Sequence, residues 1–189
     1  DNHFGHKNVI RFDNRPFADT VLMDEVLVHN WNERVTEDDT VYILGDCFWK
    51  NEENSVKLIQ RLKGHKHLIR GNHDRVHGRL RFYYESIEHY AEINNDRLVI
   101  LCHYPIPFYK NQHYGAVMLY GHVHNTREQD FIEKWKRELW ESEIPCNMIN
   151  VGCMMEYMKY TPRTLNEILA ANPAPEFRKD TQQKRDDSK

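Results

Sequence analysis

Short apolar runs, each followed by a cluster of polar residues, recur along the chain. Most of these runs are rich in Val, Ile and Leu, and each has the length of a buried β-strand rather than that of an ordinary helix. We expect strands over residues 39–44, 67–70, 97–102, 116–120 and 148–151. The chain therefore repeats one layout, in which a buried strand leads into a loop that carries Gly, Asp, Asn or His.

Between these runs, other segments have the apolar spacing or the end signals of helices. Helices are expected over residues 19–31, 54–62 and 165–171, and the charged segment 126–142 is either a helix or an insertion. Either Asp19 or Thr20 can cap the first helix. The apolar face expected for this helix consists of Val21, Leu22, Val26 and Leu27.

Strands that alternate with helices predict an α/β fold, and in open sheets of this class ligands bind beyond the carboxyl ends of the strands. With 189 residues the chain is long enough for a single domain with its own core, expected over residues 1–172. Residues 173–189 are polar and charged, so we expect a loosely held, flexible tail there. Because the chain opens on polar residues at Asp1, we also expect a strand upstream of it in the native protein.

Charge and cysteine content narrow the classes of function. With 26 basic and 29 acidic residues the net charge is -3, which gives no global attraction to nucleic acid or to an anionic membrane. No apolar run approaches the roughly 18 residues that a membrane-spanning helix needs. The four cysteines are scattered without a CxxC pair, so we expect reduced thiols in a cytoplasmic protein. Nucleic acid is then expected only as a substrate.

Five polar strings at the loop positions carry the candidate chemistry. They are Asp1-Asn-His3, Gly45-Asp46, Gly71-Asn-His-Asp74, His103 and Gly121-His-Val-His124. Each string alone is a weak signal, because a Gly-Asp turn after a strand is common and a pair of histidines can simply face solvent. Two histidines at i and i+2 point the same way on extended backbone, and imidazole is the commonest metal ligand. The order and spacing of all five strings therefore decide whether they indicate a functional site.

Together and in this order, the five strings resemble the signature of the calcineurin-like metallophosphoesterases, which reads D-x-H, G-D, G-N-H-D/E, a lone His and G-H-x-H. All five elements are present between Asp1 and His124, about two thirds of the chain. The resemblance implies an α/β fold in which a two-layer β-sandwich is flanked by helices. A looser resemblance to small bacterial and phage-type members extends over residues 160–165.

The resemblance implies a metal centre with two divalent ions bridged by Asp46. The first ion would be held by Asp1, His3, Asp46 and His124, and the second by Asp46, Asn72, His103 and His122. Mixed carboxylate and imidazole ligands suit Mn²⁺, which we expect first, and also Fe, Ni, Co or Zn. Two ions about 3.5–4 Å apart can clamp an in-line displacement at phosphorus.

The same resemblance assigns the catalytic roles to His73 and Asp74. His73 would protonate the leaving oxygen or stabilise the pentacoordinate phosphorus, and Asp74 would orient the His73 ring through a hydrogen bond. The nucleophile would be a metal-bound water or hydroxide, with a pKa lowered towards about 7. We therefore expect hydrolysis of a phosphate ester, and a phosphodiester in particular, because small members without a cap domain often act on diesters.

Residues beside the motifs carry less specific signals. His6 and Arg75 are candidate contacts to the phosphate of the substrate, with a loop histidine and a surface arginine as the alternatives. For Arg15 the simpler interpretation is a surface position. His65 and His67 resemble a turn into the following strand, and we do not expect them to be ligands.

Other functions on the same fold stay open at this point. A phosphomonoesterase or protein phosphatase would use the same ligands, and a nuclease would be favoured by a basic stripe, which is not evident. An inactive metal-binding scaffold is a further alternative, although the complete ligand set and His73 argue against it. The physiological substrate, the native metal pair and the oligomeric state do not follow from the sequence.

Overall fold

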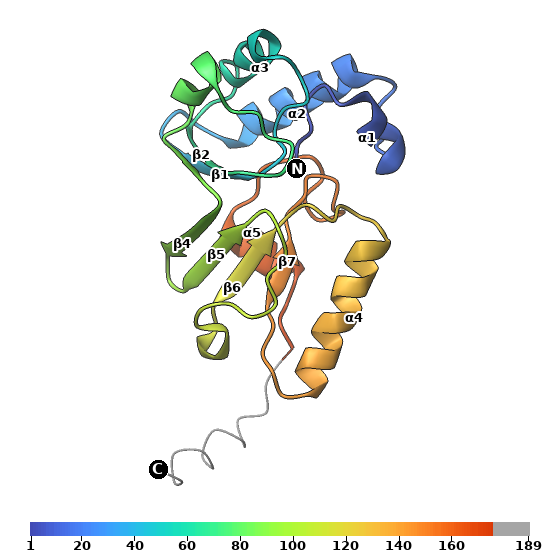
Figure 1. Ribbon diagram of the computed structural model, residues 1–189, viewed down its shortest axis with the longest axis vertical. Helices are drawn as coiled ribbons and strands as arrows, with labels where there is room; N and C mark the ends of the chain where they lie inside the picture. Colours follow the sequence, from blue (N-terminus) through green and yellow to red (C-terminus); the bar gives the residue numbers. More distant parts are fainter. Residues whose placement is uncertain (176–189) are drawn as a thin grey trace.

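The computed structural model describes residues 1–175, which form two β-sheets with helices on their outer faces (Figure 1). The first sheet is parallel and consists of β1 (Thr40–Leu44), β2 (His65–Ile69) and β3 (Ser86–Glu88), in that order. The second sheet consists, in order, of β4 (Tyr90–Asn94), β5 (Leu98–Cys102), β6 (Val117–Tyr120) and β7 (Met148–Asn150). Only the pair of β4 and β5 is antiparallel in this sheet. Each strand predicted from the sequence is present, with small differences at its ends.

Helices occupy the segments between the strands. Within the described residues they are α1 (Lys7–Phe12), α2 (Thr20–Arg34), α3 (Glu52–Ile59), α4 (Arg127–Glu141) and α5 (Leu165–Ala171), with 3₁₀ turns η1 (Gly78–Tyr83) and η2 (Gln112–Tyr114). Asp19 caps α2, since its carboxylate accepts a hydrogen bond of 2.9 Å from the Leu22 N–H. The charged segment 126–142 is the helix α4, capped by Thr126, and not an irregular insertion.

Apolar side chains alternate along the strands between two faces of each sheet. In β6, Met118 packs on the side of α4, whereas Val117 and Leu119 join the core between the two sheets. In β1, Ile43 packs towards α2 and α3, whereas Leu44 joins the same central core. The molecule is thus layered as helix, sheet, sheet and helix. The predicted α/β class, with a two-layer sandwich flanked by helices, is confirmed.

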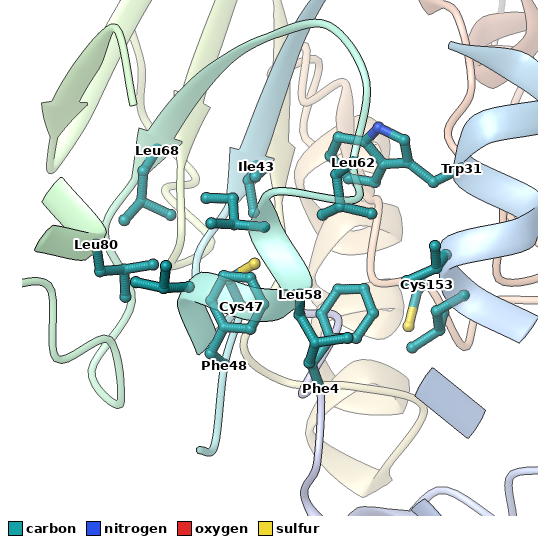
Figure 2. Packing of buried hydrophobic residues seen from close by; sticks show 14 of the residues in the cluster. Phe4, Trp31, Ile43, Cys47, Phe48, Leu58, Leu62, Leu68, Leu80 and Cys153 are labelled. Atoms are coloured by element: carbon teal, nitrogen blue, oxygen red, sulfur yellow. The ribbon is translucent and has the colours of Figure 1, made fainter. Parts of the chain in front are cut away.

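The core between the first sheet and its helices also holds the start of the chain. Figure 2 shows Phe4 and Phe48 within this core, and their rings are stacked with centroids 5.3 Å apart. Trp31 of α2 closes the same cluster, and its indole N–H donates to the carbonyl oxygen of Lys63 at 2.9 Å. Phe4 lies one residue beyond His3, so this core anchors the first of the polar strings.

The predicted apolar face of α2 is wrong in part. Val21 and Leu22 are 70% and 47% exposed, whereas Met23, Leu27 and Trp31 are almost completely buried. These three buried residues are spaced by four and form one stripe on the helix. Val21 is two residues from Met23, about 200° around the helix axis, and therefore faces solvent.

Short elements account for the remaining differences from the sequence prediction. α1, β3 and β4 were not predicted, because segments of three to six residues carry too little periodicity to be recognised. His65 and His67 lie in β2 and not in a turn. Nδ1 of His65 is 2.7 Å from Oε1 of Glu85, and Nδ1 of His67 is 2.9 Å from Oγ of Ser86, so both rings reach sideways towards the neighbouring chain segment.

A cavity of about 430 Å³ lies beside β1, the outermost strand of its sheet, and is lined by Asp1, Asn2 and apolar side chains of both sheets.

The strand predicted upstream of Asp1 stays a prediction. So does the tail predicted over residues 173–189, which beyond position 175 lies outside the described residues. No helix within residues 1–175 has both the length and the hydrophobicity to cross a bilayer.

Separate alanine substitutions of Met23 and Val21 test the assigned face of α2. Met23→Ala removes a fully buried side chain and is expected to lower the free energy of unfolding by about 2–5 kcal/mol. Val21→Ala, on the exposed face of the same helix, is expected to change it by no more than about 0.5 kcal/mol. Urea unfolding followed by circular dichroism measures both values, and equal losses would contradict the assignment.

Candidate metal centre

The polar strings meet where the two halves of the molecule join. The loops after β1, β2, β5 and β6 carry Asp46, Asn72, His103, His122 and His124, and the start of the chain carries Asp1 and His3. Figure 1 shows the start of the chain at the junction between the two sheets. The first string is fixed to the second by backbone hydrogen bonds of 2.9 Å, from the His3 N–H to the Asp46 carbonyl and from the Phe4 N–H to the Cys47 carbonyl.

Asp1, His3 and His124 form a first group of converging side chains. The Nε2 atoms of His3 and His124 are 3.2 Å apart, and they lie 3.7 and 3.8 Å from Oδ1 of Asp1. Metal–ligand bonds of about 2.0–2.2 Å place neighbouring ligand atoms roughly 3–4 Å apart. The three side chains therefore have the spacing that a single ion requires.

Asp46 stands between this group and a second one. Its Oδ2 is 3.8 Å from Nε2 of His3 and 3.7 Å from Nε2 of His103. Nε2 of His103 is in turn 3.0 Å from Oδ1 of Asn72. One carboxylate oxygen thus faces imidazoles of both groups, which is the position that a bridging ligand needs.

His122 lies beside the centre but less tightly than the other candidate ligands. Its ring is 5.0 Å from the ring of His103, and its backbone N–H donates to Oδ2 of Asp1. Among the His, Cys, Asp and Glu residues within positions 1–175, the tight groups are Asp1 with His3 and His124, and Asp1 with Asp46 and His103. The role of the His122 ring as a ligand therefore stays a prediction.

The donor set fits divalent cations. Oδ1 of Asp1 is buried and has no hydrogen-bond partner among the described residues, which is costly for a carboxylate oxygen unless a cation satisfies it. Burial lowers the pKa of His103 to about 4, and it also lowers the pKa of His3 and of His122 below the ordinary range. These imidazoles are neutral at neutral pH, as ligation requires.

Two glycines of the strings allow the ligands to come this close. A Cβ atom on Gly71 would overlap the carboxylate of Asp46, and one on Gly121 would overlap the carboxylate of Asp1. Any larger residue at either position would push a ligand out of place. The glycines in G-N-H-D and G-H-x-H are therefore required by the packing of the Asp46 and Asp1 carboxylates.

The ligand loops also hold unusual backbone conformations. His3, Asp46, His122 and His124 have φ angles between 43° and 66°, in the left-handed region. Residues other than glycine avoid this region, and each such position costs about 1–3 kcal/mol. Strain of this kind at four of the seven predicted ligands shows that the loops are shaped for the site and not for local stability.

Asp74 has a different role from the one predicted. Its Oδ2 accepts hydrogen bonds of 2.8 Å from the N–H groups of Asp46 and Gly71, and its Oδ1 accepts one of 2.9 Å from the Cys47 N–H. Within residues 1–175 no hydrogen bond joins Asp74 to the ring of His73. The carboxylate is buried and turned towards the loop backbone, so it holds two ligand loops together and does not orient the His73 ring.

Comparison with known families identifies the chain. A family model described as calcineurin-like phosphoesterase matches residues 1–167, which include all of the polar strings. The chain belongs to the calcineurin-like phosphoesterase family. Membership implies metal-dependent hydrolysis of phosphate esters, in agreement with the carboxylate and imidazole groups described above.

Relatives of this phosphoesterase cover most of its length. MJ1445 of Methanocaldococcus jannaschii, an uncharacterized protein, is 32% identical over 173 residues, covering 89% of this chain and 86% of that protein. The gene 66 protein of Mycobacterium phage L5 is 29% identical over 160 residues, covering 66% and 75%. The crystal structure of AQ665 from Aquifex aeolicus, a protein of unknown function, has a TM-score of 0.67 at 25% identity and covers 90% and 95%. The phage relative agrees with the resemblance to small phage-type members.

Two of the predicted ligand histidines of the phosphoesterase are oriented through their Nδ1 atoms. Nδ1 of His103 is 3.0 Å from the carbonyl oxygen of Leu44, to which it donates, and Nδ1 of His124 donates to Oδ1 of Asp13 at 2.8 Å. Each contact leaves Nε2 unprotonated and free to face an ion. A carboxylate behind a ligand imidazole also raises its basicity.

Arg15 is buried and not on the surface, and this corrects the sequence interpretation. It is 4% exposed, its Nε donates a hydrogen bond of 2.9 Å to Oδ2 of Asp13, and its Nη2 forms an ion pair with the same oxygen at 2.9 Å. Burial alone would raise the pKa of Asp13, but the hydrogen bond to His124 and the charge of Arg15 outweigh it and lower that pKa. Asp13 was not predicted, because nothing in the sequence indicates that its loop folds back onto a histidine 111 residues away.

His6, Trp49 and His73 border the metal centre. The His6 ring is stacked on the Trp49 indole, with centroids 3.9 Å apart and an interplanar angle of 7°, and its Nδ1 is 3.2 Å from Nδ1 of His3. His6 therefore contacts a ligand histidine, while its contact to phosphate stays a prediction. Trp49 was missed, since a single Trp after a strand is most often a core residue. Arg75 is exposed, and its contact to phosphate also stays a prediction.

Asp13→Asn tests whether the contact behind His124 supports the metal centre. The amide keeps the shape of the side chain but loses the charge, so affinity for Mn²⁺ is expected to fall about 10–100-fold. Isothermal titration calorimetry on the metal-free protein measures this affinity. Asp96→Asn, an exposed position in the turn between β4 and β5, is the matched control and should bind like the wild type. Unchanged affinity in Asp13→Asn would contradict the assigned role.

Proposed function

We propose that this phosphoesterase hydrolyses phosphodiesters with two divalent ions held by Asp1, His3, Asp46, Asn72, His103, His122 and His124. The observation that carries the proposal is the position of Asp46. Its Oδ2 lies 3.8 Å from Nε2 of His3 and 3.7 Å from Nε2 of His103. The unsatisfied Oδ1 of Asp1 adds a second, independent reason to expect a cation. Mn²⁺ is the proposed metal, and Fe, Ni, Co or Zn would suit the same ligands.

The ions, when bound, activate water and neutralise the charge of the phosphate. Asn72 contributes a neutral amide oxygen, which limits negative charge where an anionic substrate binds. Asp46 links the ion site to His73, because its Oδ1 accepts a hydrogen bond of 2.8 Å from the His73 N–H. His73 is thereby held at the border of the metal centre, with its ring 6.4 Å from that of His3.

His73 is proposed as the proton donor of the reaction. Water loses one proton to the solvent as its oxygen forms a bond to phosphorus, the bond from phosphorus to the leaving oxygen breaks, and His73 gives its proton to that oxygen. The ring is exposed and makes no hydrogen bond within residues 1–175, so it is available to a substrate. Asp74 contributes indirectly, since it fixes the loop on which Asp46 stands.

A diester is proposed as the substrate class on the basis of similarity to small members of the family without a cap domain. Water and the phosphate ester are the expected partners, and nucleic acid is expected only as a substrate.

A cytoplasmic location is proposed from the cysteines, all four of which are free thiols in the structure. Burial raises the pKa of Cys47, Cys102 and Cys146, so these thiols are unreactive core residues.

His73→Ala tests the proton donor. With Mn²⁺ and methyl phenyl phosphate, kcat/KM is expected to fall about 10²–10⁴-fold, because phenolate is a poor leaving group without a proton. Metal content, measured by plasma mass spectrometry, should stay at the wild-type value. His113→Ala, an exposed histidine in η2, is the control and should keep full activity. Wild-type activity in His73→Ala would show that the donor is another group.

The ester class is tested with one chromophore. Bis-p-nitrophenyl phosphate and p-nitrophenyl phosphate release the same product, so their kcat/KM values with Mn²⁺ compare the two classes directly. We expect the diester to be hydrolysed at least about 10-fold more efficiently, a transition-state difference of about 1.4 kcal/mol. A clear preference for the monoester would exclude the proposed substrate class and leave the metal assignment intact.

A further inference from the structure

Trp49 is the residue near the metal centre for which neither the sequence motifs nor the proposed mechanism provides a role. It follows the ligand Asp46 by three residues, and 43% of its surface is exposed. Its indole lies among three histidines, with centroid distances of 3.9 Å to His6, 4.5 Å to His73 and 5.9 Å to His3. A large aromatic side chain left half-exposed in such surroundings calls for a functional explanation.

The indole is fixed on the side of the metal ligands. It stacks in parallel on His6, whose Nδ1 is 3.2 Å from Nδ1 of His3. The backbone N–H of Trp49 donates to the carbonyl oxygen of Phe4 at 2.8 Å, and Phe4 is itself completely buried. Trp49 is thus held rigidly by the loop that carries the first metal ligands.

The ring of His73 has few other restraints. Its backbone is held by Asp46, but within residues 1–175 the ring accepts and donates no hydrogen bond, and Asp74 faces the loop backbone. The Trp49 indole, tilted by 56° at 4.5 Å, is the nearest aromatic ring to His73. Packing against the indole is therefore what limits the rotation of the imidazole.

His73 and Trp49 also share the wall of an open cleft of about 660 Å³. Arg75 and His77 line the same cleft together with acidic and apolar side chains, among them Glu52 and Leu80. Clefts of about 300–1,000 Å³ are typical of sites for small ligands. The imidazole therefore stands between the metal ligands and a space that can receive the organic group of an ester.

We propose that Trp49 is a positioning residue, which holds the His73 ring in the wall of this cleft so that it can protonate the leaving oxygen of the substrate. The inference rests on the proposed role of His73 as proton donor and extends it to the substrate class. An enzyme with a well-positioned donor cleaves esters of weakly acidic alcohols, which leave only when protonated. Without that donor it cleaves only activated esters such as those of p-nitrophenol, whose oxyanion leaves without a proton.

The test compares two methyl diesters that differ in the acidity of the leaving group, methyl phenyl phosphate and methyl p-nitrophenyl phosphate, with Mn²⁺ present. In Trp49→Ala, kcat/KM is expected to fall at least about 10-fold more for the phenyl ester than for the nitrophenyl ester. This loss is a fraction of the rate acceleration of about 10²–10⁴-fold that a general acid contributes. Trp49→Phe keeps an aromatic ring beside His73 and should restore most of the loss on the phenyl ester.

Tyr104→Ala is the matched control. Tyr104 is also 43% exposed, and its ring lies 4.6 Å from His122 and 5.0 Å from His103, on ligand histidines and not on His73. Its removal should change both esters by the same factor. In the metal-free protein, the imidazole resonances of His73 should shift in Trp49→Ala and stay close to the wild type in Tyr104→Ala.

The outcomes separate this inference from the proposed function. If His73→Ala shows the leaving-group dependence and Trp49→Ala reduces both esters equally, Trp49 has only a structural role and the inference is wrong, while the proton donor stands. If His73→Ala itself affects both esters equally, His73 is not the donor and both proposals fail. Selective loss in both variants, with recovery in Trp49→Phe, supports both.

Discussion

The metal centre depends on an exchange of hydrogen bonds between two neighbouring aspartates. Asp74 accepts three backbone N–H groups, two from the loop of Asp46 and one from its own loop at Gly71. Asp46 in turn accepts the N–H of His73 through one oxygen and keeps the other for the imidazoles. Loops after adjacent parallel strands are thereby held together, and the hydrogen bonds couple Asp46, the proposed bridging ligand, to His73, the proposed proton donor. Charge-assisted bonds of this kind are among the stronger ones in a protein, especially when buried.

This lock explains how strained loops persist. Left-handed backbone at His3, Asp46, His122 and His124 is unfavourable in each case, and local sequence preference would relax it. The surrounding structure prevents relaxation, because the first loop pairs with the second along its backbone and stacks Phe4 on Phe48 in the core. The buried apolar residues next to the site thus stabilise the conformation of the polar loops, so a change in the core is expected to affect the loops as well.

The sequence indicates which residues are candidate ligands but not the residues that support them, for a physical reason. Ligand chemistry limits each position to a few residue types at fixed distances from strand ends, so the strings around Asp46 and His124 stand out. The short apolar runs likewise indicate the strands. The pattern of apolar residues does not reveal a short helix such as α1, and it gives the buried face of α2 wrongly in part. Asp13 and Trp49 support the site through contacts that only the folded chain creates. Asp74 was predicted as a catalytic residue, but its partners turned out to be backbone groups, which no side-chain pattern reveals.

The bonds that place Asp46, Asp74 and His73 join protein groups to one another and do not require a cation. Besides the hydroxyl of Tyr84, Oδ1 of Asp1 is the buried side-chain oxygen or nitrogen without a hydrogen-bond partner among the described residues, and this is costly for a carboxylate oxygen unless a cation satisfies it. A cation there would remove this cost and stabilise the folded state by mass action, without having to organise the remaining ligands. The constraint that shapes the loops is therefore the protein's own hydrogen bonding.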